Sequence, residues 1–283
     1  MVFEAALVDD KAITFDASNN KVVIAYLDGG NSNYGTAIVG TVSGTSISFG
    51  TAVVFESASS SYFSAAYDSA NNKVVIAYQD GGNSDYGTAI VGTVSGTSIS
   101  FGTAVVFSAT TTYYNSITFD STNNKAVIAY RGTPNNGAAI VGTVSGTSIS
   151  FGTEVVFAAS SNDETAIFDS SNNKIVIAYK DNATAEGRAI VGTVSGTSIS
   201  FGTEVVFNAS STAYTSATFD SNLNKVVIGY QDGGNSNYGT LIVGTVSGTA
   251  ISFGSSTVFN ASSTNYIALT FDTTNNKVVY FGS

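Results

Sequence analysis

The chain has 283 residues, of which 43% are hydrophobic and 11% are charged, with one Pro and no Trp, His or Cys. This composition supports a large apolar core and excludes a disulfide framework, thiolate metal sites and His- or Cys-based catalysis. The formal net charge of −10 opposes binding to nucleic acid or anionic membranes, because such partners need clustered Lys and Arg.

The opening decapeptide, MVFEAALVDD, has no basic segment and no long apolar run, so it predicts no signal peptide. No stretch of the chain approaches the roughly 20 apolar residues of a membrane span.

An internal repeat of about 50 residues dominates the sequence. The string TVSGTSISFG begins at Thr41 and recurs unchanged three times, and TVSGTAISFG begins at Thr245. An aromatic-Asp pair marks the other half of each unit, ending at Asp16, Asp68, Asp120, Asp169, Asp220 and Asp272. The chain therefore contains about 5.5 copies of one unit and is expected to fold as a single domain over residues 1–283.

Each unit predicts four short strands. The first ends at the aromatic-Asp pair, and a DxxNNK turn leads into a second, wholly apolar strand at Val22 to Tyr26. Asn tolerates the left-handed backbone of such a turn, and an uninterrupted apolar run is typical of a strand covered on both faces.

The second half of the unit begins with the predicted third strand, Ala37 to Val42, which contains Gly40. A glycine inside a strand marks a bulge or a close backbone approach, and we expect a neighbouring sheet at this point. Gly44 suits the first central position of a type II′ hairpin turn. Ile47 and Phe49 then alternate with serines, as expected for a half-exposed fourth strand.

Four antiparallel strands per unit predict an all-β fold, a β-propeller of four-stranded blades. The chain ends halfway through a sixth unit, and Val2-Phe3 aligns with Val54-Phe55 at the end of a fourth strand. We therefore expect six blades with an incomplete closing blade, in which Val2-Phe3 meets the strand at Val278 to Phe281. A five-bladed ring, a β-solenoid and a string of small sandwich domains are the alternatives.

The run NNKVVIAYxDGGNSxYGTAIVGTVSGTSISFGTxVVF resembles repeat units of large surface proteins and virion-associated proteins of marine bacteria and their phages. The resemblance spans nearly the whole chain. It implies a propeller-like module displayed outside the cell or on a virion surface, and it supplies no site residues. Near-identity of successive units also fits a designed or amplified repeat protein.

Catalysis is not expected. The six Asp residues of the DxxNNK turns are equivalent, whereas a catalytic site needs a unique place, and such Asp side chains ordinarily cap their own turn. We therefore predict no catalytic residue and no enzyme activity.

Ligand contact is instead expected on the face that carries the second-to-third turns and the links between units, because loops that vary on a constant scaffold commonly carry recognition. The candidate residues there are Asp28, Asn31, Tyr34, Tyr62, Asp80, Asn83, Asp85, Tyr86, Tyr114, Tyr214, Asp232, Asn235, Tyr238 and Tyr266.

Tyr rings beside Asn, Asp and Gly suit sugars, because rings stack on apolar sugar faces and short polar groups bond the hydroxyls. The sequence thus predicts a binding module for glycans or a surface receptor, with no cofactor and with self-association through the incomplete blade as a further expectation. The Asp-Gly-Gly-Asn-Ser-Asp loop leaves calcium open as a ligand. The alternative is a structural repeat, natural or designed, without a specific ligand.

Overall fold

The repeated unit folds as a four-stranded antiparallel sheet in the computed structural model, which describes residues 2–283. In the first sheet the order is β1 (Val8–Asp16), β2 (Lys21–Asp28), β3 (Tyr34–Ser43) and β4 (Ser46–Phe49). The turns are those expected: Asn20 and Gly44 have φ values of +53° and +59°. Burial decreases from β2 and β3 to β4, as the apolar patterning predicts.

The outer edge of each sheet is built from two segments. β4 pairs with the second half of β3, and the start of β5 (Val53–Asp68) pairs with the first half. The remainder of β5 then forms the innermost strand of the second sheet. One continuous segment therefore closes one sheet and opens the next.

The same pattern recurs along the chain, and only the sixth unit is cut to two strands. The second sheet has β6 (Lys73–Asp80), β7 (Tyr86–Ser95), β8 (Ser98–Phe101) and β9 (Val105–Thr111), with 3-10 helix η1 (Gly81–Asn83). The third has β10 (Tyr113–Asp120), β11 (Lys125–Arg131), β12 (Gly137–Ser145), β13 (Ser148–Phe151) and β14 (Val155–Ala158). The fourth has β15 (Asn162–Asp169), β16 (Lys174–Lys180), β17 (Gly187–Ser195), β18 (Ser198–Phe201) and β19 (Val205–Asn208). The fifth has β20 (Thr212–Asp220), β21 (Lys225–Asp232), η2 (Gly233–Asn235), β22 (Tyr238–Ser247), β23 (Ala250–Phe253) and β24 (Thr257–Ser263), and the sixth has β25 (Ala268–Asp272) and β26 (Lys277–Phe281).

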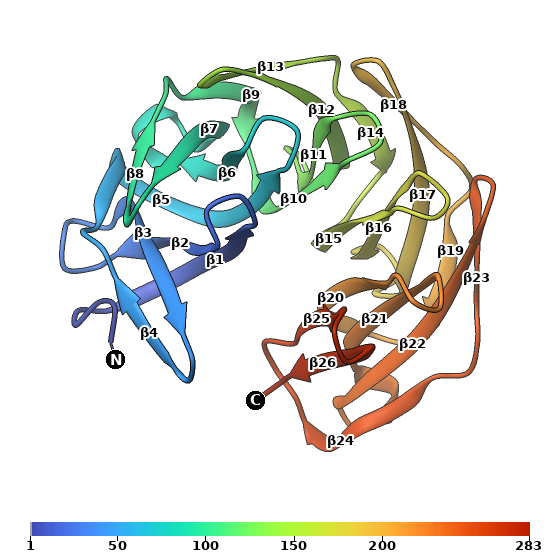
Figure 1. The fold of residues 1–283 in the computed structure, drawn as a ribbon. Helices are drawn as coiled ribbons and strands as arrows, with labels where there is room; N and C mark the ends of the chain where they lie inside the picture. The colour runs from blue at the N-terminus through green and yellow to red at the C-terminus, as the bar shows by residue number, and fades with distance from the viewer. Residues whose placement is uncertain (1) are drawn as a thin grey trace.

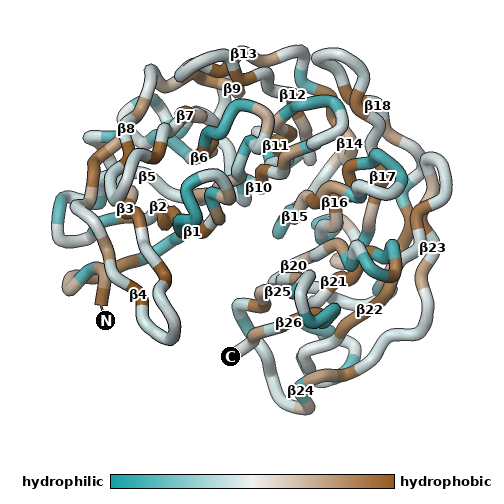
Figure 2. Tube along the Cα trace, in the orientation of Figure 1, coloured by the Kyte–Doolittle hydropathy of each residue, from teal (hydrophilic) through white to brown (hydrophobic). Residues whose placement is uncertain are grey.

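The sheets stand around a central axis like the blades of a propeller (Figure 1). The first strands of successive sheets, β1, β5, β10, β15, β20 and β25, contact one another in order and are innermost. Hydrophobic residues are concentrated in the strands, and the loops are mainly hydrophilic (Figure 2). None of the helical segments within residues 2–283 is long and apolar enough to cross a bilayer. The antiparallel sheets confirm the all-β prediction; the blade number of a closed ring stays a prediction.

Apolar packing between neighbouring sheets forms the core. Val23 and Val39 of the first sheet are fully buried against Ile76, Tyr78 and Ile90 of the second. Equivalent clusters join the second sheet to the third, the third to the fourth and the fourth to the fifth. Burial of each of these side chains contributes about 1.5–3 kcal/mol before the entropic cost of ordering it. Packing between neighbouring sheets is therefore a main source of stability.

The turn aspartates are structural, as the sequence predicts. Asp68 is buried, and its carboxylate accepts hydrogen bonds from the backbone N–H of Asn71 at 3.0 Å and from the side-chain amide of Asn71 at 2.9 Å. Asp16 makes the equivalent pair of bonds with Asn19.

The expectation for Gly40 is wrong. A Cβ placed there would meet Ile47 Cδ1 at 3.0 Å and the Phe49 ring at 3.1 Å, both on β4 of the same sheet. Gly40 makes room for side chains of its own hairpin and not for a neighbouring sheet. The close approach between sheets lies instead at Gly50, where a Cβ would lie 1.8 Å from the carbonyl oxygen of Thr97 in the next sheet.

The expected closure is also not found. β26 pairs with β25 alone, and Val2 and Phe3 lie outside the strands. Phe3 packs on Tyr26 and Phe49, with ring centroids 5.2 and 5.7 Å apart. Phe55 has the same place against the second sheet, so the alignment of Phe3 with Phe55 is right. In a full sheet the Val53–Glu56 segment pairs with the third strand. The sixth sheet has only β25 and β26, so Val2-Phe3 has no third strand to pair with and the ring does not close there.

Substituting Gly102 by Ala tests the close approach between sheets. Its Cβ would lie 1.8 Å from the Thr147 carbonyl oxygen, so we expect Gly102→Ala to lower the free energy of unfolding by about 1–3 kcal/mol or more. Gly254 ends the same SFG motif but meets only the Val243 carbonyl oxygen, at 3.9 Å, so Gly254→Ala is the matched control with an expected change within about 0.5 kcal/mol. Urea unfolding of both variants measures the difference; equal losses would contradict the assignment.

Candidate functional site

One residue of each unit takes a left-handed backbone conformation at the same point of the innermost segment. In the first five sheets this point is a β-bulge, where the register between the first and second strands shifts. The six equivalent residues have φ between +43° and +54° and are here called the inner ring: Asp10, Tyr62, Tyr114, Asp163, Tyr214 and Tyr266. The bulge turns these residues out of the regular strand alternation.

Two cavities lie against the inner ring. The smaller, of about 230 Å³, is lined by five inner-ring residues, all but Tyr266, together with Phe63, Asn115, Glu164 and Thr215. The larger, of about 890 Å³, is lined by Asp10, Tyr62 and Tyr266 and by other residues of the first, second, third and sixth sheets, among them Gln79 and Phe281. The inner ring therefore borders the hollow centre of the molecule.

The aspartates of the inner ring are tied to the next unit. The Asp10 carboxylate accepts hydrogen bonds from the backbone N–H groups of Tyr62 and Phe63, and that of Asp163 accepts one from the N–H of Tyr214 at 3.2 Å. Burial raises the pKa of Asp10 and of Asp163, and these backbone hydrogen bonds oppose the rise. Both carboxylates thus connect neighbouring sheets as well as bordering the cavity.

The tyrosines of the inner ring form aromatic pairs. The ring centroids of Tyr62 and Tyr114 are 5.3 Å apart, as are those of Tyr214 and Tyr266. The Arg131 guanidinium lies 4.1 Å from the ring centroid of Tyr113 and 5.2 Å from that of Tyr114, within cation–π range. This packing fixes the rings that face the centre.

Three buried polar atoms beside these rings have no hydrogen-bond partner in the protein: Oδ1 of Asn115, Oε2 of Glu164 and Nε of Arg131. Asn115 donates through Nδ2 to the Tyr62 carbonyl oxygen at 3.1 Å, and Glu164 accepts from the Ser161 hydroxyl through Oε1. Burial raises the pKa of Glu164 to about 8, so this carboxyl holds its proton at neutral pH. Both residues line the smaller cavity, and an amide beside a protonated carboxyl can bond hydroxyl groups of a ligand.

The other candidates lie in the second-to-third loops. Asp28, Asp80 and Asp232 each accept a hydrogen bond from the N–H of the glycine two residues on, at 2.9–3.0 Å. The Asn33 carbonyl oxygen accepts from the N–H of Ser60 at 3.2 Å, so loop and link share a face as expected.

These loop residues line neither cavity of the inner ring. Their asparagines and Asp85 are exposed, and their tyrosines are half-buried at the start of the third strands. The set comprises Asp28, Asn31, Tyr34, Asp80, Asn83, Asp85, Tyr86, Asp232, Asn235 and Tyr238. The structure therefore brings Tyr62, Tyr114, Tyr214 and Tyr266 together and leaves the loop set spread over three sheets.

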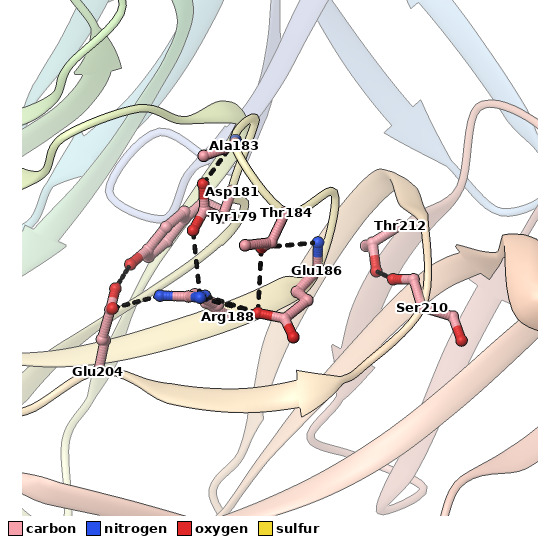
Figure 3. Close-up of polar contacts among 9 residues, drawn as sticks. All are labelled: Tyr179, Asp181, Ala183, Thr184, Glu186, Arg188, Glu204, Ser210 and Thr212. Carbon is pink, nitrogen blue, oxygen red and sulfur yellow. Dashed lines mark hydrogen bonds and ion pairs between the residues drawn. The ribbon is translucent and has the colours of Figure 1, made fainter.

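The fourth unit differs from the rest by an ion-pair cluster around Arg188 (Figure 3). Its guanidinium lies 3.3 Å from Asp181 and 2.7 Å from Glu186, and it also contacts Glu204, which accepts a hydrogen bond from the Tyr179 hydroxyl. The hydrogen bond from Arg188 lowers the pKa of the Glu186 carboxyl. One guanidinium thus contacts three carboxylates, and its ion pairs with Asp181 and Glu186 brace the 181–186 loop.

Sequence reasoning missed Asp10, Asn115 and Glu164 as cavity residues. The signal was present in part, because the fourth unit replaces the link tyrosine by Asn-Asp-Glu. This replacement could not be interpreted from the sequence, because the β-bulge that places one residue of each unit toward the axis is visible only in the structure. Within residues 2–283 no group of three or more His, Cys, Asp or Glu is arranged to hold a metal ion.

The comparisons support the fold. No protein-family model matches the chain, and no curated protein matches it. Among solved structures, AofleA from Arthrobotrys oligospora is similar with a TM-score of 0.60 and 10% identity, over 97% of this chain and 79% of that chain. SapL1 lectin in complex with alpha methyl fucoside is similar with a TM-score of 0.58 and 11% identity, over 97% of this chain and 87% of that one. At such identity the likeness shows the fold alone.

The raised pKa of Glu164 predicts a pH dependence of stability. The native state holds this proton up to pH of about 8 while the unfolded state releases it near 4.5, so its stabilising effect is full below pH 4.5 and is lost as pH rises to 8. Glu164→Gln keeps the shape and cannot titrate. We expect its melting temperature to fall less than that of the parent between pH 4.5 and 8.

The control is Asp85→Asn, which removes an exposed loop carboxylate and is expected to keep the parent's slope. A Glu164→Gln slope as steep as the parent's would show that Glu164 is ionised in the folded state.

Proposed function

We propose that this protein is a non-catalytic carbohydrate-binding module whose site is the smaller cavity of the inner ring. The observation that carries the proposal is that three tyrosines line one cavity together with Asn115 and Glu164, each of which has a buried oxygen without a hydrogen-bond partner. Aromatic faces next to convergent polar groups are the combination that sugars require.

The size of the cavity favours a small ligand. Its volume of about 230 Å³ is below the ~300–1,000 Å³ range of pockets that hold drug-sized molecules, so a single sugar residue is a better fit than an extended chain. The fold supports the proposal because a similar solved structure is that of a lectin in complex with alpha methyl fucoside.

The absence of catalysis is part of the proposal. The sequence contains no His and no Cys, and the Asp10 and Asp163 carboxylates already accept backbone hydrogen bonds. From the resemblance of the repeats we also propose that the protein is displayed on a cell or virion surface and that its partner is a glycan-bearing receptor. The proposed sugar binding does not require calcium or another cofactor.

A glycan array tests this function, followed by titration of the bound sugar. We expect Tyr214→Ala to weaken binding by about tenfold or more, because it removes a stacking face worth about 1.4 kcal/mol or more. Tyr238→Ala, on a half-buried tyrosine of the same sheet outside the cavity, is the matched control and is expected to bind like the parent.

Three outcomes contradict the proposal in different ways. Loss of binding in Tyr238→Ala alone would move the site to the second-to-third loops. No sugar bound above background would favour a structural repeat without a ligand. Release of product from reporter glycosides would show an enzyme.

A further inference from the structure

The exposed ends of the sheet array repeat the interface that joins its interior sheets. Each interior sheet has a forward face, which packs on the next sheet, and a backward face, which packs on the previous one. In the first sheet Val23 and Val39 belong to the forward face, and in the second Ile76, Ile90 and Val94 belong to the backward face. All of these side chains are buried.

The backward face of the first sheet is only partly covered, because the N-terminal segment buries Ile24, Tyr26 and Ile38 but leaves the rest of the face open. Val42 is 54% exposed, whereas its equivalents Val94, Val144, Val194 and Val246 are 6–7% exposed. Ile13 and Phe15 on β1 are exposed as well, and the equivalent of Ile13 in the third sheet is buried. No polar residue replaces these apolar ones, although terminal units of repeat proteins usually carry a polar outer face.

The forward side of the last sheet is uncovered in the same way. Val279 is 50% exposed, and its equivalents in the five preceding sheets are at most 6% exposed. Phe281 is exposed beside it, and the outer edge of β26 has no hydrogen-bonded partner strand. An apolar strand with a free edge is a ready template for association with another chain.

The chemistry of the two ends is complementary because they are the two halves of one repeated contact. Four interior interfaces already pair a forward face with a backward face of almost identical sequence. Figure 1 places the ends on opposite sides of the opening in the ring, with the N-terminus on the first sheet and the C-terminus on the last. A second copy of this chain therefore offers the surface that each end fits.

We propose that copies of this protein associate head to tail, with the backward face of the first sheet of one copy packed on the forward face of β25–β26 of the next. The contact is heterologous, so it joins copies in a closed ring or an open filament and not in a symmetric dimer. It is independent of sugar binding, because no residue named for the two ends lines the smaller cavity.

Charge acts against this association and makes it sensitive to salt. Each copy has a formal net charge of −10, so copies repel one another at low ionic strength. Screening shortens the range of that repulsion while leaving apolar contact intact. Head-to-tail assembly is therefore expected to strengthen as salt is raised.

Sedimentation analysis of the chain over a concentration series tests the proposal. The parent is expected to form species larger than a monomer, more so at high salt. Val42→Asp and Val279→Asp each place a charge at one end and are expected to weaken association by about tenfold or more. An equimolar mixture of the two variants keeps one intact face of each kind and is expected to form a dimer that neither variant forms alone.

Val156→Asp is the matched control. Val156 is 54% exposed, as Val42 is, but it lies on the outer segment β14, where the equivalent valines Val54, Val106 and Val206 are also exposed. This variant is expected to assemble like the parent, and circular dichroism checks that all three variants fold. A monomeric parent, a Val42→Asp effect without a Val279→Asp effect, or a mixture that fails to restore the dimer would each overturn the proposal.

Discussion

The face-to-face packing of neighbouring sheets is the contact on which the rest of this structure depends. The second and third strands of each unit carry apolar residues on both sides, so a single sheet has no stable solvent-exposed form. Stacking around an axis satisfies both sides of every interior sheet. The order of sheets, the inward position of the first strands and the hollow centre all follow from that requirement.

Close contact between sheets also explains which residues do not vary. Gly102 must lack a side chain because the Thr147 carbonyl occupies its Cβ position, and the buried Asp68 must hold its turn because the next strand begins there. Residues at the bulge are under no such restriction on chemistry. The inner ring can therefore contain Tyr in four units and Asp in two without a change of scaffold.

Much of the fold could be predicted from the sequence because its signals are local and repeated. Asn20 and Gly44 mark turns through their own backbone preferences, and the apolar run at Val22 to Tyr26 marks a buried strand. The role of Gly40 could not be predicted. A glycine within a strand indicates a close contact, but it does not identify the residues that make that contact, here Ile47 and Phe49. The prediction that Val2-Phe3 closes the ring was wrong for a related reason. Such a segment pairs with the third strand of a sheet, and the last unit lacks a third strand.

The site was predicted in part. Tyr62, Tyr114, Tyr214 and Tyr266 were identified from the variation of the links, and the structure brings them to one centre. Glu164 could not be identified, because its importance comes from burial and an unpartnered oxygen, which are properties of the assembled sheets. The ten loop candidates share Tyr and Asp with the inner ring, but they line neither of its cavities.

The left-handed backbone of the inner ring has a further consequence. Glycine adopts that conformation without steric cost and Asp tolerates it, whereas a Tyr raises the energy of the folded chain by about 1–2 kcal/mol at each position. All six units nevertheless carry a side chain there, with φ between +43° and +54°. At all six positions of the inner ring the chain thus has a side chain with a polar group where glycine would cause less backbone strain.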